Sequence, residues 1–230
     1  MRILVIDIGG SHVKGALPDR QRRFRFASGP HMTPDEMVVR VLKRTASWRF
    51  DGVSIGYPGV VRDNRPAVDP VNLGPGWVGF DFQSRLGRPV RMINDAAMQA
   101  MGGYDGGTML FLGLGTGLGT TLIVDGTVVP LELGHLAYRK GQEYEYDLGE
   151  EGRRRLGMKR WKARVREVAE AFRQALLPDY IVLGGGNAAR LKRLPPYIRR
   201  GHRSDAFRGG VRMWQRPRTN AGRRRGAQHA

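Results

Sequence analysis

Cysteine is absent from the 230 residues, so the chain has no disulfide bond, no thiolate metal site and no catalytic thiol. The N-terminus also lacks a long apolar run. Residues 1–6 lead directly into Asp7, which makes this run too short for a signal peptide or a membrane span, and we expect a cytoplasmic protein without a membrane partner. Apolar residues still make up 40% of the sequence, enough to bury a real core, which excludes a wholly disordered chain.

Acidic residues are few, because 21 Asp and Glu face 39 Lys and Arg and leave a formal net charge of +18. Residues 189–230 carry 13 of the basic side chains and one acid, Asp205, and their stretch around Arg223 to Arg225 is expected to be disordered. Only six of the 39 basic residues are lysine, an arginine bias that a GC-rich genome would produce on any solvated surface. A second basic cluster on a predicted helix has the charge to bind a polyanion: Arg153, Arg154, Arg155, Lys159, Arg160, Lys162, Arg164 and Arg166.

The order of predicted elements is typical of an α/β fold. Residues 2–8 and 12–17 are predicted to pair as a hairpin around Gly9-Gly10. Thr33-Pro34-Asp35-Glu36 is a capping box that opens a helix ending near Trp48, and Asp125-Gly126 predicts another hairpin. The other predicted elements are strands at 52–56, 89–93, 108–113, 119–124, 127–129 and 180–183, and helices at 95–103, at 159–177 and after 187.

Two glycine-rich turns follow predicted strands and have the chemistry to bind phosphate. In Asp7-Ile8-Gly9-Gly10-Ser11 the glycines let backbone N–H groups approach an anion, and Asp7 can bind a hydrated divalent cation. A Gly-Gly hairpin explains this turn equally well. In residues 113–120 a glycine at every second position clears one face of the backbone, although the segment matches neither the dinucleotide fingerprint nor the Walker loop.

Two further turns join a strand to a helix. Asn94-Asp95 places a carboxylate where the helix dipole is expected to keep it ionised and exposed for proton abstraction, although a simple helix cap has the same pattern. Gly184-Gly185-Gly186-Asn187 suits a nucleotide or phosphate at a helix N-terminus. Each turn alone has a structural explanation, so the functional hypothesis depends on their order along one chain.

That order resembles the actin-like sugar kinase superfamily and, within it, the ROK family. Residues 7–11 are similar to its first phosphate motif, 114–119 to its second, 183–187 to its adenosine motif and Asn94-Asp95 to its catalytic pair. Its sugar-binding segments resemble residues 56–59, 72–77 and 132–135. The resemblance covers about residues 2–214 and is closest to the polyphosphate glucokinase branch, through residues 157–161, 184–188 and 206–214.

The resemblance implies an enzyme that transfers a phosphoryl group from polyphosphate, ATP or both to the 6-hydroxyl of glucose or a related hexose, with Mg²⁺ and without zinc. Asp95 would be the general base, and Asp7 would organise the magnesium through water. The implied sugar-binding residues are Gly59, Asn72, Asn94, Glu132, His135 and Glu145. The implied phosphate and nucleotide-binding residues are Asp7, Gly9, Gly10, Ser11, Lys14, Gly115, Thr116, Gly117, Gly119, Gly184, Gly185, Gly186 and Asn187, with Lys159, Arg160 and Lys162 for polyphosphate.

The implied architecture is two ribonuclease-H-like α/β lobes of the actin and hexokinase type, with the active site in the cleft between them. We expect residues 1–95 to form the first lobe and 96–214 the second, whose last segment is able to return to the first. Residues 215–230 are expected to form a basic, disordered tail. A homodimer is expected, with a small hexose and a polyanionic donor as ligands.

Departures from the family pattern change some expectations. Many ROK proteins have a cysteine cluster after the Glu-x-Gly-His segment that binds structural zinc with the histidine, whereas here His135 is expected to be a sugar ligand or a buried structural histidine. ROK repressors have an N-terminal helix-turn-helix, whereas here the first predicted strand begins at residue 2, which disfavours a DNA regulator. The order Tyr144-Glu145-Tyr146-Asp147 also differs from the family's. Two alternatives remain: a catalytically weak ROK-like protein that binds nucleic acid or another polyanion, and a kinase for an amino or acylated sugar.

Overall fold

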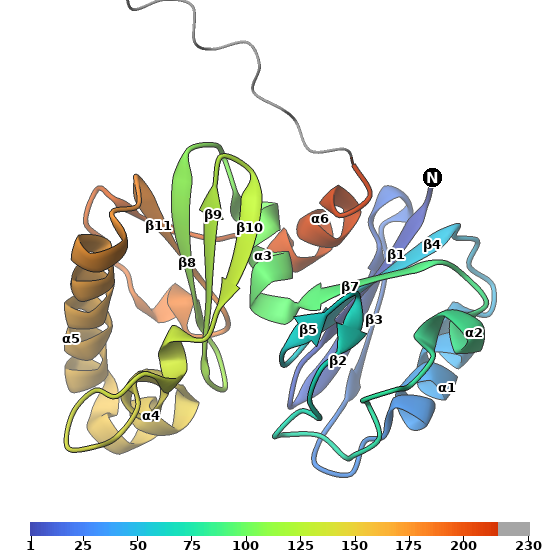
Figure 1. Ribbon diagram of the computed structural model, residues 1–230, viewed down its shortest axis with the longest axis horizontal. Helices are drawn as coiled ribbons and strands as arrows, with labels where there is room; N and C mark the ends of the chain where they lie inside the picture. Colours follow the sequence, from blue (N-terminus) through green and yellow to red (C-terminus); the bar gives the residue numbers. More distant parts are fainter. Residues whose placement is uncertain (216–230) are drawn as a thin grey trace, which may run out of the picture.

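The computed structural model describes residues 1–215 and contains two five-stranded sheets that lie side by side (Figure 1). Helices cover the outer face of each sheet, and two further helices lie between them. The predicted two-lobed α/β fold is therefore confirmed. The prediction of a disordered basic tail concerns residues that, apart from Gln215, lie outside the described range.

The first sheet has the strand order β3-β2-β1-β4-β7. β1 (Ile3–Ile8), β2 (His12–Leu17) and β3 (Arg22–Ala27) form an antiparallel meander, whereas β4 (Gly52–Tyr57) and β7 (Val90–Asn94) run parallel to β1. Every residue of β1 and β4 is buried, which explains their continuous apolar runs. Because β1, β4 and β7 are parallel, their carboxyl ends lie at the same edge of the sheet.

The predicted capping box opens the longer helix of this lobe, α1 (Pro34–Thr45). The hydroxyl of Thr33 accepts the amide hydrogen of Glu36 at 3.3 Å, and the helix ends three residues before the predicted end. α1 and α2 (Phe82–Leu86) lie together on the outer face of the sheet (Figure 1). The remaining short elements of the lobe are η1 (Pro18–Arg20), β5 (Val61–Arg62) and β6 (Arg65–Pro66).

The second sheet repeats the topology of the first, with the order β10-β9-β8-β11-β12. β8 (Thr108–Leu114), β9 (Leu118–Val124) and β10 (Thr127–Leu131) form the antiparallel meander, and β11 (Tyr180–Gly184) and β12 (Ile198–Arg200) run parallel to β8. The glycine-rich turns that follow β8 and β11 therefore lie at one edge of this sheet, as the corresponding turns do in the first lobe.

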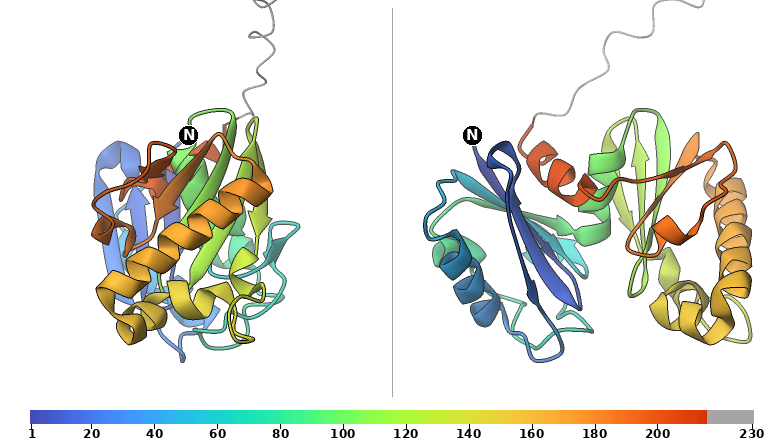
Figure 2. Two further views of the ribbon diagram at one scale, coloured as in Figure 1. Left: turned by 90° about the vertical axis from the view of Figure 1, so that its left-hand side faces the viewer. Right: turned by 180° about the vertical axis from the view of Figure 1, so that it is seen from behind.

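The helix predicted at residues 159–177 begins earlier than expected. α5 (Glu150–Leu176) covers the outer face of the second sheet and follows α4 (Tyr144–Leu148) (Figure 2). Gly157 interrupts it with a φ of 72°, a backbone conformation that favours glycine, and so separates a charged first segment from the amphipathic second one. The apolar period begins only after this break, which is why the sequence pattern missed the first two turns. η2 (Leu133–His135) and η3 (Ala188–Arg190) complete the lobe.

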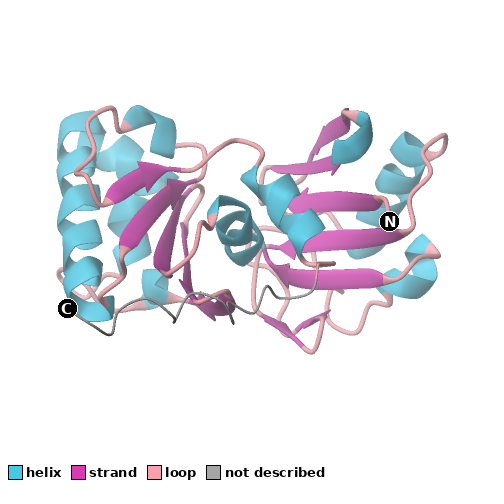
Figure 3. Ribbon diagram, turned by 90° about the horizontal axis from the view of Figure 1, so that it is seen from above, coloured by secondary structure: helices cyan, strands magenta, loops and turns pink. Residues whose placement is uncertain are grey.

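α3 (Asp95–Gly103) and α6 (Asp205–Arg212) pack against each other between the two sheets (Figure 3). The backbones touch at Gly102 and Gly209, where a Cβ would overlap the carbonyl oxygens of Asp205 and Met98. Seen from behind, the chain crosses from β12 to α6 and reaches the first lobe (Figure 2). Within residues 1–215, no helix combines the length and the apolar character needed to span a bilayer.

The last described turn of the chain bonds to the first sheet through Ser54. This buried residue of β4 donates its hydroxyl hydrogen to the carbonyl oxygen of Gly210 at 2.6 Å and accepts a hydrogen bond from Nε1 of Trp214 at 2.8 Å. The guanidinium of Arg91 lies 4.5 Å from the centroid of the Trp214 ring. The segment around α6 is therefore attached to the first sheet by these bonds, in addition to its packing against α3.

Candidate active site

The parallel strands of the first lobe bring Asp7 and the Asn94-Asp95 pair to the same edge. Asp7 pairs in register with Gly56 of β4, and a Cβ on Gly56 would lie 3.3 Å from the Cα of Asp95. Asn94 caps α3, because its Oδ1 accepts the amide hydrogen of Ala97 at 3.1 Å, and its Nδ2 donates to the carbonyl oxygen of Gly59 at 3.2 Å. Asn94 thus fixes both the start of α3 and the turn after β4.

Asp95 has a strongly perturbed carboxyl group at this edge. Burial raises its pKa, and the negative charges of Asp7 and Glu132 raise it further, to about 7. The hydrogen bond that Oδ1 accepts from the amide of Ala96, at 2.7 Å, acts in the opposite direction but is outweighed. The prediction that the helix dipole keeps this carboxylate ionised is therefore corrected. Desolvation and the two neighbouring carboxylates raise the pKa of Asp95 by more than the favourable effects at the helix start lower it. A carboxyl group with this pKa can accept and return a proton near neutral pH.

Asp7 lies at the end of β1 and is 7% exposed. Burial raises its pKa, while Lys14, whose Nζ donates a hydrogen bond to Oδ2 at 3.5 Å, lowers it. Carboxylate oxygens suit Mg²⁺, which usually keeps several waters and takes one or two protein carboxylates. Asp7 is therefore a carboxylate that suits such a hydrated ion, and the part of the chain that the structure describes has no cluster of three or more metal-ligating side chains.

The glycine-rich turn between β8 and β9, which resembles the family's second phosphate motif and is called the second phosphate turn for that reason, lies against the start of α3. A Cβ on Gly119 would be 2.7 Å from the Cβ of Ala96, so only glycine lets this turn lie beside the residue that follows Asp95. On its other side, Oε2 of Glu145 accepts the amide hydrogen of Leu118 at 2.8 Å and occupies the space of a Cβ on Gly117. Glu145, which the resemblance implies as a sugar ligand, thus contacts the phosphate turn directly.

The turn after β11 packs on the same phosphate turn. Gly185 has a φ of 78°, and the N–H of Asn187 donates to the carbonyl oxygen of Leu114 at 3.0 Å. The side chain of Asn187 is buried, with Nδ2 donating to Glu150 at 2.9 Å and Oδ1 accepting from Nε of Arg190 at 3.0 Å. Asn187 therefore uses its polar side-chain atoms to shape the turn.

A segment of the first lobe that includes Asn72 packs against the first phosphate turn. A Cβ on Gly10 would lie 2.9 Å from the Cβ of Asn72. Asp69 organises this segment, because its carboxylate accepts three backbone N–H groups, from Gly76, Trp77 and Val78, at 2.8 to 3.2 Å, and these bonds lower its pKa. Sequence analysis missed Asp69. Its place before a turn with two glycines and a buried tryptophan was the only available signal.

Glu132 and His135 lie at the two ends of η2, in the second lobe. Nδ1 of His135 is 2.8 Å from Oε2 of Glu143, and its Nε2 is 3.9 Å from Oε2 of Glu132. The hydrogen bond with Glu143, helped by the charges of Glu145, Glu143 and Glu132, raises the pKa of His135, whereas burial raises that of Glu132. The His135 side chain is 56% exposed, so a buried structural histidine is the wrong interpretation. Sequence analysis did not single out Glu143.

Apart from Arg166, which donates to the carbonyl oxygen of Arg193 at 3.3 Å, the predicted basic cluster divides into two groups on α5. The cations before Gly157, together with Arg164, make ion pairs within 4 Å: Arg153 and Arg154 with Glu150, Arg155 and Arg164 with Asp147, and Arg164 also with Glu167. By contrast, Lys159, Arg160 and Lys162 have no carboxylate within 4 Å among residues 1–215, and the first two are exposed. The predicted polyphosphate residues therefore keep their full positive charge.

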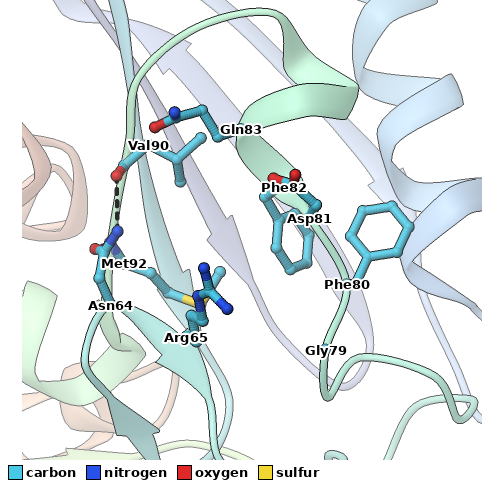
Figure 4. Close-up of a pocket in the computed structure, with 9 residues that line it drawn as sticks. All are labelled: Asn64, Arg65, Gly79, Phe80, Asp81, Phe82, Gln83, Val90 and Met92. Carbon is cyan, nitrogen blue, oxygen red and sulfur yellow. Dashed lines mark hydrogen bonds between the residues drawn. The ribbon is translucent and has the colours of Figure 1, made fainter.

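A cavity of about 420 Å³ lies in the first lobe (Figure 4). Its lining does not include Asp7 or Asp95. The side chain of Asn64, which lines this cavity, bonds to the neighbouring edge strand β7, donating to the carbonyl oxygen of Val90 at 2.8 Å and accepting the amide hydrogen of Met92 at 2.5 Å. These bonds occupy two backbone groups that an edge strand would otherwise leave unpaired. We therefore assign Asn64 a structural role.

Two lobes of the same sheet topology, with glycine-rich turns at their strand ends and a carboxylate at the first residue of the helix between them, are typical of the actin-like ATPase fold. Within it, the chain belongs to the ROK family, whose family model matches residues 3–140. The predicted family is thereby confirmed.

Known relatives extend this likeness over most of the chain. A polyphosphate glucokinase of Mycobacterium tuberculosis is 26% identical over 217 residues, covering 84% of this chain and 80% of the relative. The crystal structure of an inorganic polyphosphate/ATP-glucomannokinase from Arthrobacter sp. strain KM has a TM-score of 0.78 and 28% identity, covering 91% of this chain and 96% of that one. A ROK family glucokinase of Streptomyces griseus, solved with glucose and AMPPNP, shares the fold with a TM-score of 0.69 at 17% identity, covering 93% and 99%.

Proposed function

We propose that the chain is a hexose kinase that transfers a phosphoryl group to the 6-hydroxyl of glucose or a closely related hexose. The observation that carries this proposal is Asp95, a carboxyl group with a pKa of about 7 at a helix start, beside Asp7 of its own lobe and within electrostatic reach of Glu132 of the other. The names of the relatives, polyphosphate glucokinase and polyphosphate/ATP-glucomannokinase, support the same reaction class.

In this reaction Asp95 accepts the proton of the 6-hydroxyl as that oxygen bonds to the terminal phosphorus of the donor. The bond from phosphorus to the bridging oxygen breaks, and the shortened donor leaves with the electron pair. Phosphoryl transfer needs mainly in-line positioning and charge neutralisation. Asn94, Glu132 and His135 would bind other hydroxyls of the sugar and so determine which oxygen reaches Asp95.

The donor phosphates would lie between the turns after β1 and β8. Gly10 and Ser11 offer backbone N–H groups from one lobe, and Thr116 and Gly117 offer them from the other, whereas the N–H groups of Gly9, Gly115 and Leu118 already bond within the protein. Mg²⁺, bound through Asp7, would supply charge neutralisation on the phosphate oxygens. Lys14 would add a positive charge beside Asp7, from which its ammonium lies 3.5 Å away.

For the donor, we propose inorganic polyphosphate, with ATP as a second donor. Lys159, Arg160 and Lys162 form a cationic stretch of α5 without carboxylate partners among residues 1–215, which an extended polyanion can use and a triphosphate does not need. Asn187 offers little to an adenosine group, because both polar atoms of its buried side chain bond within the protein. The homodimer expected from the resemblance remains part of this proposal.

The decisive experiment is a coupled assay of glucose, mannose, N-acetylglucosamine and glucosamine, each with polyphosphate and with ATP, on the wild type and on Asp95→Asn. We expect phosphorylation of glucose or mannose, and a rate lower by roughly 10²- to 10⁴-fold in the variant with sugar affinity little changed. Asp81→Asn, at an exposed helix cap in the first lobe, is the matched control and should keep wild-type activity.

Near-normal turnover of Asp95→Asn would remove Asp95 from its role. Phosphorylation of only the amino or acylated sugar would reassign the substrate. No sugar phosphorylation, combined with a salt-dependent gel shift of nucleic acid, would instead favour the alternative of a polyanion-binding protein, for which the net charge of +18 is the motivating observation.

A further inference from the structure

A second cavity, of about 300 Å³, lies beside α6 and contains none of the candidate active-site residues. We call it the α6 pocket. It forms where the carboxyl end of α3, the end of β12 and the start of α6 meet. Its lining includes four arginines, Arg199, Arg200, Arg208 and Arg212, and two carboxylates, Asp105 and Asp205.

The charges that line the α6 pocket do not cancel. Its four arginines face only two carboxylates, and the ion pairs are long: Arg199 lies 3.4 Å from Asp105, and Arg208 lies 3.5 Å from Asp205. The other two arginines, Arg200 and Arg212, have no carboxylate of the described residues within 4 Å. Two guanidinium charges therefore remain uncompensated in one small cavity, which favours an anionic ligand.

Three of these guanidinium groups are held in place by contacts that leave some of their donors unused. Arg199 stacks on the ring of Tyr180, with its central carbon 4.0 Å from the ring centroid. Arg212 donates to the carbonyl oxygens of Met101 and, at 3.0 Å, Tyr104, and Arg200 donates to that of Leu191 at 2.8 Å. A guanidinium has five N–H donors, so each can still donate to a ligand, and its planar fork matches the oxygens of a phosphate group.

The carboxylate at the base of the pocket specifies a further feature of the ligand. Asp205 is 4% exposed, and its Oδ2 accepts the amide hydrogen of His202 at 2.6 Å. Its Oδ1 is buried with no hydrogen-bond donor in the described part of the chain, apart from the long approach of Arg208. The pocket therefore combines several donors with one unsatisfied acceptor, and the matching anion carries an O–H group as well as negative charge.

We propose that the α6 pocket binds hydrogen phosphate, either as inorganic phosphate or as the phosphate group of a small hydroxylated ester. Such a ligand would accept hydrogen bonds from the arginines of β12 and α6 and donate one to Asp205. It would join β12 of the second lobe to the helix that packs on β1 of the first. This site is separate from the proposed donor track on α5 and does not depend on the proposed kinase reaction.

The test is calorimetric titration of the full chain at pH 8 and constant ionic strength with inorganic phosphate, sulfate and glucose 6-phosphate. Sulfate has the same charge as hydrogen phosphate at this pH but no proton to donate. Arg200→Gln and Arg208→Gln remove pocket cations, and Arg20→Gln and Arg49→Gln, which remove exposed arginines of the first lobe, are the matched controls. Hydrogen exchange of residues 198–212, with and without phosphate, reports binding at the pocket itself.

We expect phosphate to bind about tenfold more tightly than sulfate, and each pocket variant to weaken phosphate binding by about tenfold while the controls do not. Exchange of residues 198–212 should slow in the wild type and in the controls only. Tighter binding of glucose 6-phosphate than of phosphate would identify the ester as the ligand source. The proposal would be overturned by equal affinity for sulfate and phosphate, by an equal loss of phosphate affinity in the control variants, or by unchanged hydrogen exchange of residues 198–212. Sugar phosphorylation by the same variants tests the kinase proposal separately.

Discussion

The carboxylate of Asp7 is the strongest charged influence on Asp95, and only burial raises the pKa of Asp95 more. Because a neighbouring negative charge disfavours a second one, Asp7→Asn should lower the pKa of Asp95 below its value of about 7. The acidic limb of the pH–rate profile, where activity falls as Asp95 takes up a proton, should then move to lower pH. A ¹³C NMR titration of the aspartate carboxyls measures the same shift without turnover.

The control for this shift is Asp19→Asn, which removes an exposed carboxylate from η1. It should leave the titration of Asp95 unchanged. If Asp7→Asn lowers the rate at every pH but leaves the acidic limb in place, Asp7 acts only through the metal, and its electrostatic effect on Asp95 is refuted.

The raised pKa of Asp95 also predicts how stability depends on pH. The folded protein keeps a proton on Asp95 up to about pH 7, whereas the unfolded chain loses it near the ordinary value of 3.8. Stability from this group is therefore full below about pH 4 and is lost as the pH rises through 7. Asp95→Asn removes that loss, so at pH 8 the variant should be more stable than the wild type by about 1 to 3 kcal/mol, and the difference should disappear at pH 4. Urea denaturation at both pH values measures it, and an equal gain at both would contradict the linkage.

Glu143 orients His135 and raises its pKa, which predicts a specific effect of Glu143→Gln. Removing the carboxylate should lower the pKa of His135 and raise the KM for the hexose by about tenfold, with a smaller effect on kcat. ¹H–¹⁵N spectra of the imidazole and steady-state kinetics check the two parts. Glu151→Gln, on the exposed start of α5, serves as the control. A merely structural role would change stability without changing the imidazole titration.

Much of the fold could be predicted because its elements depend on local signals. The capping box at Thr33 and the Asp125-Gly126 turn, with φ values of 48° and 86° in the structure, specify their conformations within a few residues. β12 and α6 escaped prediction, since each is short and is stabilised by contacts with residues distant in sequence, and the short elements β3, α2 and α4 were missed as well. The start of α5 was missed because Gly157 breaks the helical period that sequence analysis follows.

The candidate site divides in the same way. Residues in the glycine-rich turns, such as Gly9 and Gly119, could be predicted from the sequence, because the glycines specify the turn and the candidate site uses the backbone of that turn. The protonation of Asp95 does not, because it depends on Asp7 and Glu132, which are distant in sequence and close in space. Glu143 could not be recognised either, since a surface glutamate gains a role only when the chain folds back to place it 2.8 Å from His135.

The attachment of α6 to the first lobe predicts an effect on stability. Ser54→Ala removes a buried hydroxyl that bonds Gly210 and Trp214, leaving a carbonyl and an indole N–H without their partner, and should lower the free energy of unfolding by about 1 to 3 kcal/mol. Thermal denaturation followed by tryptophan fluorescence measures the change. Ser47→Ala, at an exposed position after α1, should have little effect. An equally small effect of Ser54→Ala would show that apolar packing alone attaches the helix.

The uncompensated cations of α5 predict how the two donors differ. Reversing the charge of Lys159, Arg160 and Lys162 to glutamate should raise the KM for polyphosphate strongly and leave ATP kinetics nearly unchanged, because only an extended polyanion needs additional cations beyond the triphosphate site. By analogy with single-stranded nucleic acid, losing three phosphate contacts should also reduce the slope of log affinity against log salt by roughly 2.

Charge reversal at Arg20, Lys43 and Arg49 is the control, because it changes the net charge by the same amount on exposed residues of the first lobe. If both triple variants weaken polyphosphate equally, the effect comes from the overall charge of +18 and not from a track on α5. If the α5 variant weakens ATP and polyphosphate by the same factor, its cations act on the common phosphate site. Only a selective loss for the long donor, with a reduced salt slope, places polyphosphate along α5, since only an extended chain can reach cations on the outer helix while its terminal phosphate lies at Asp95.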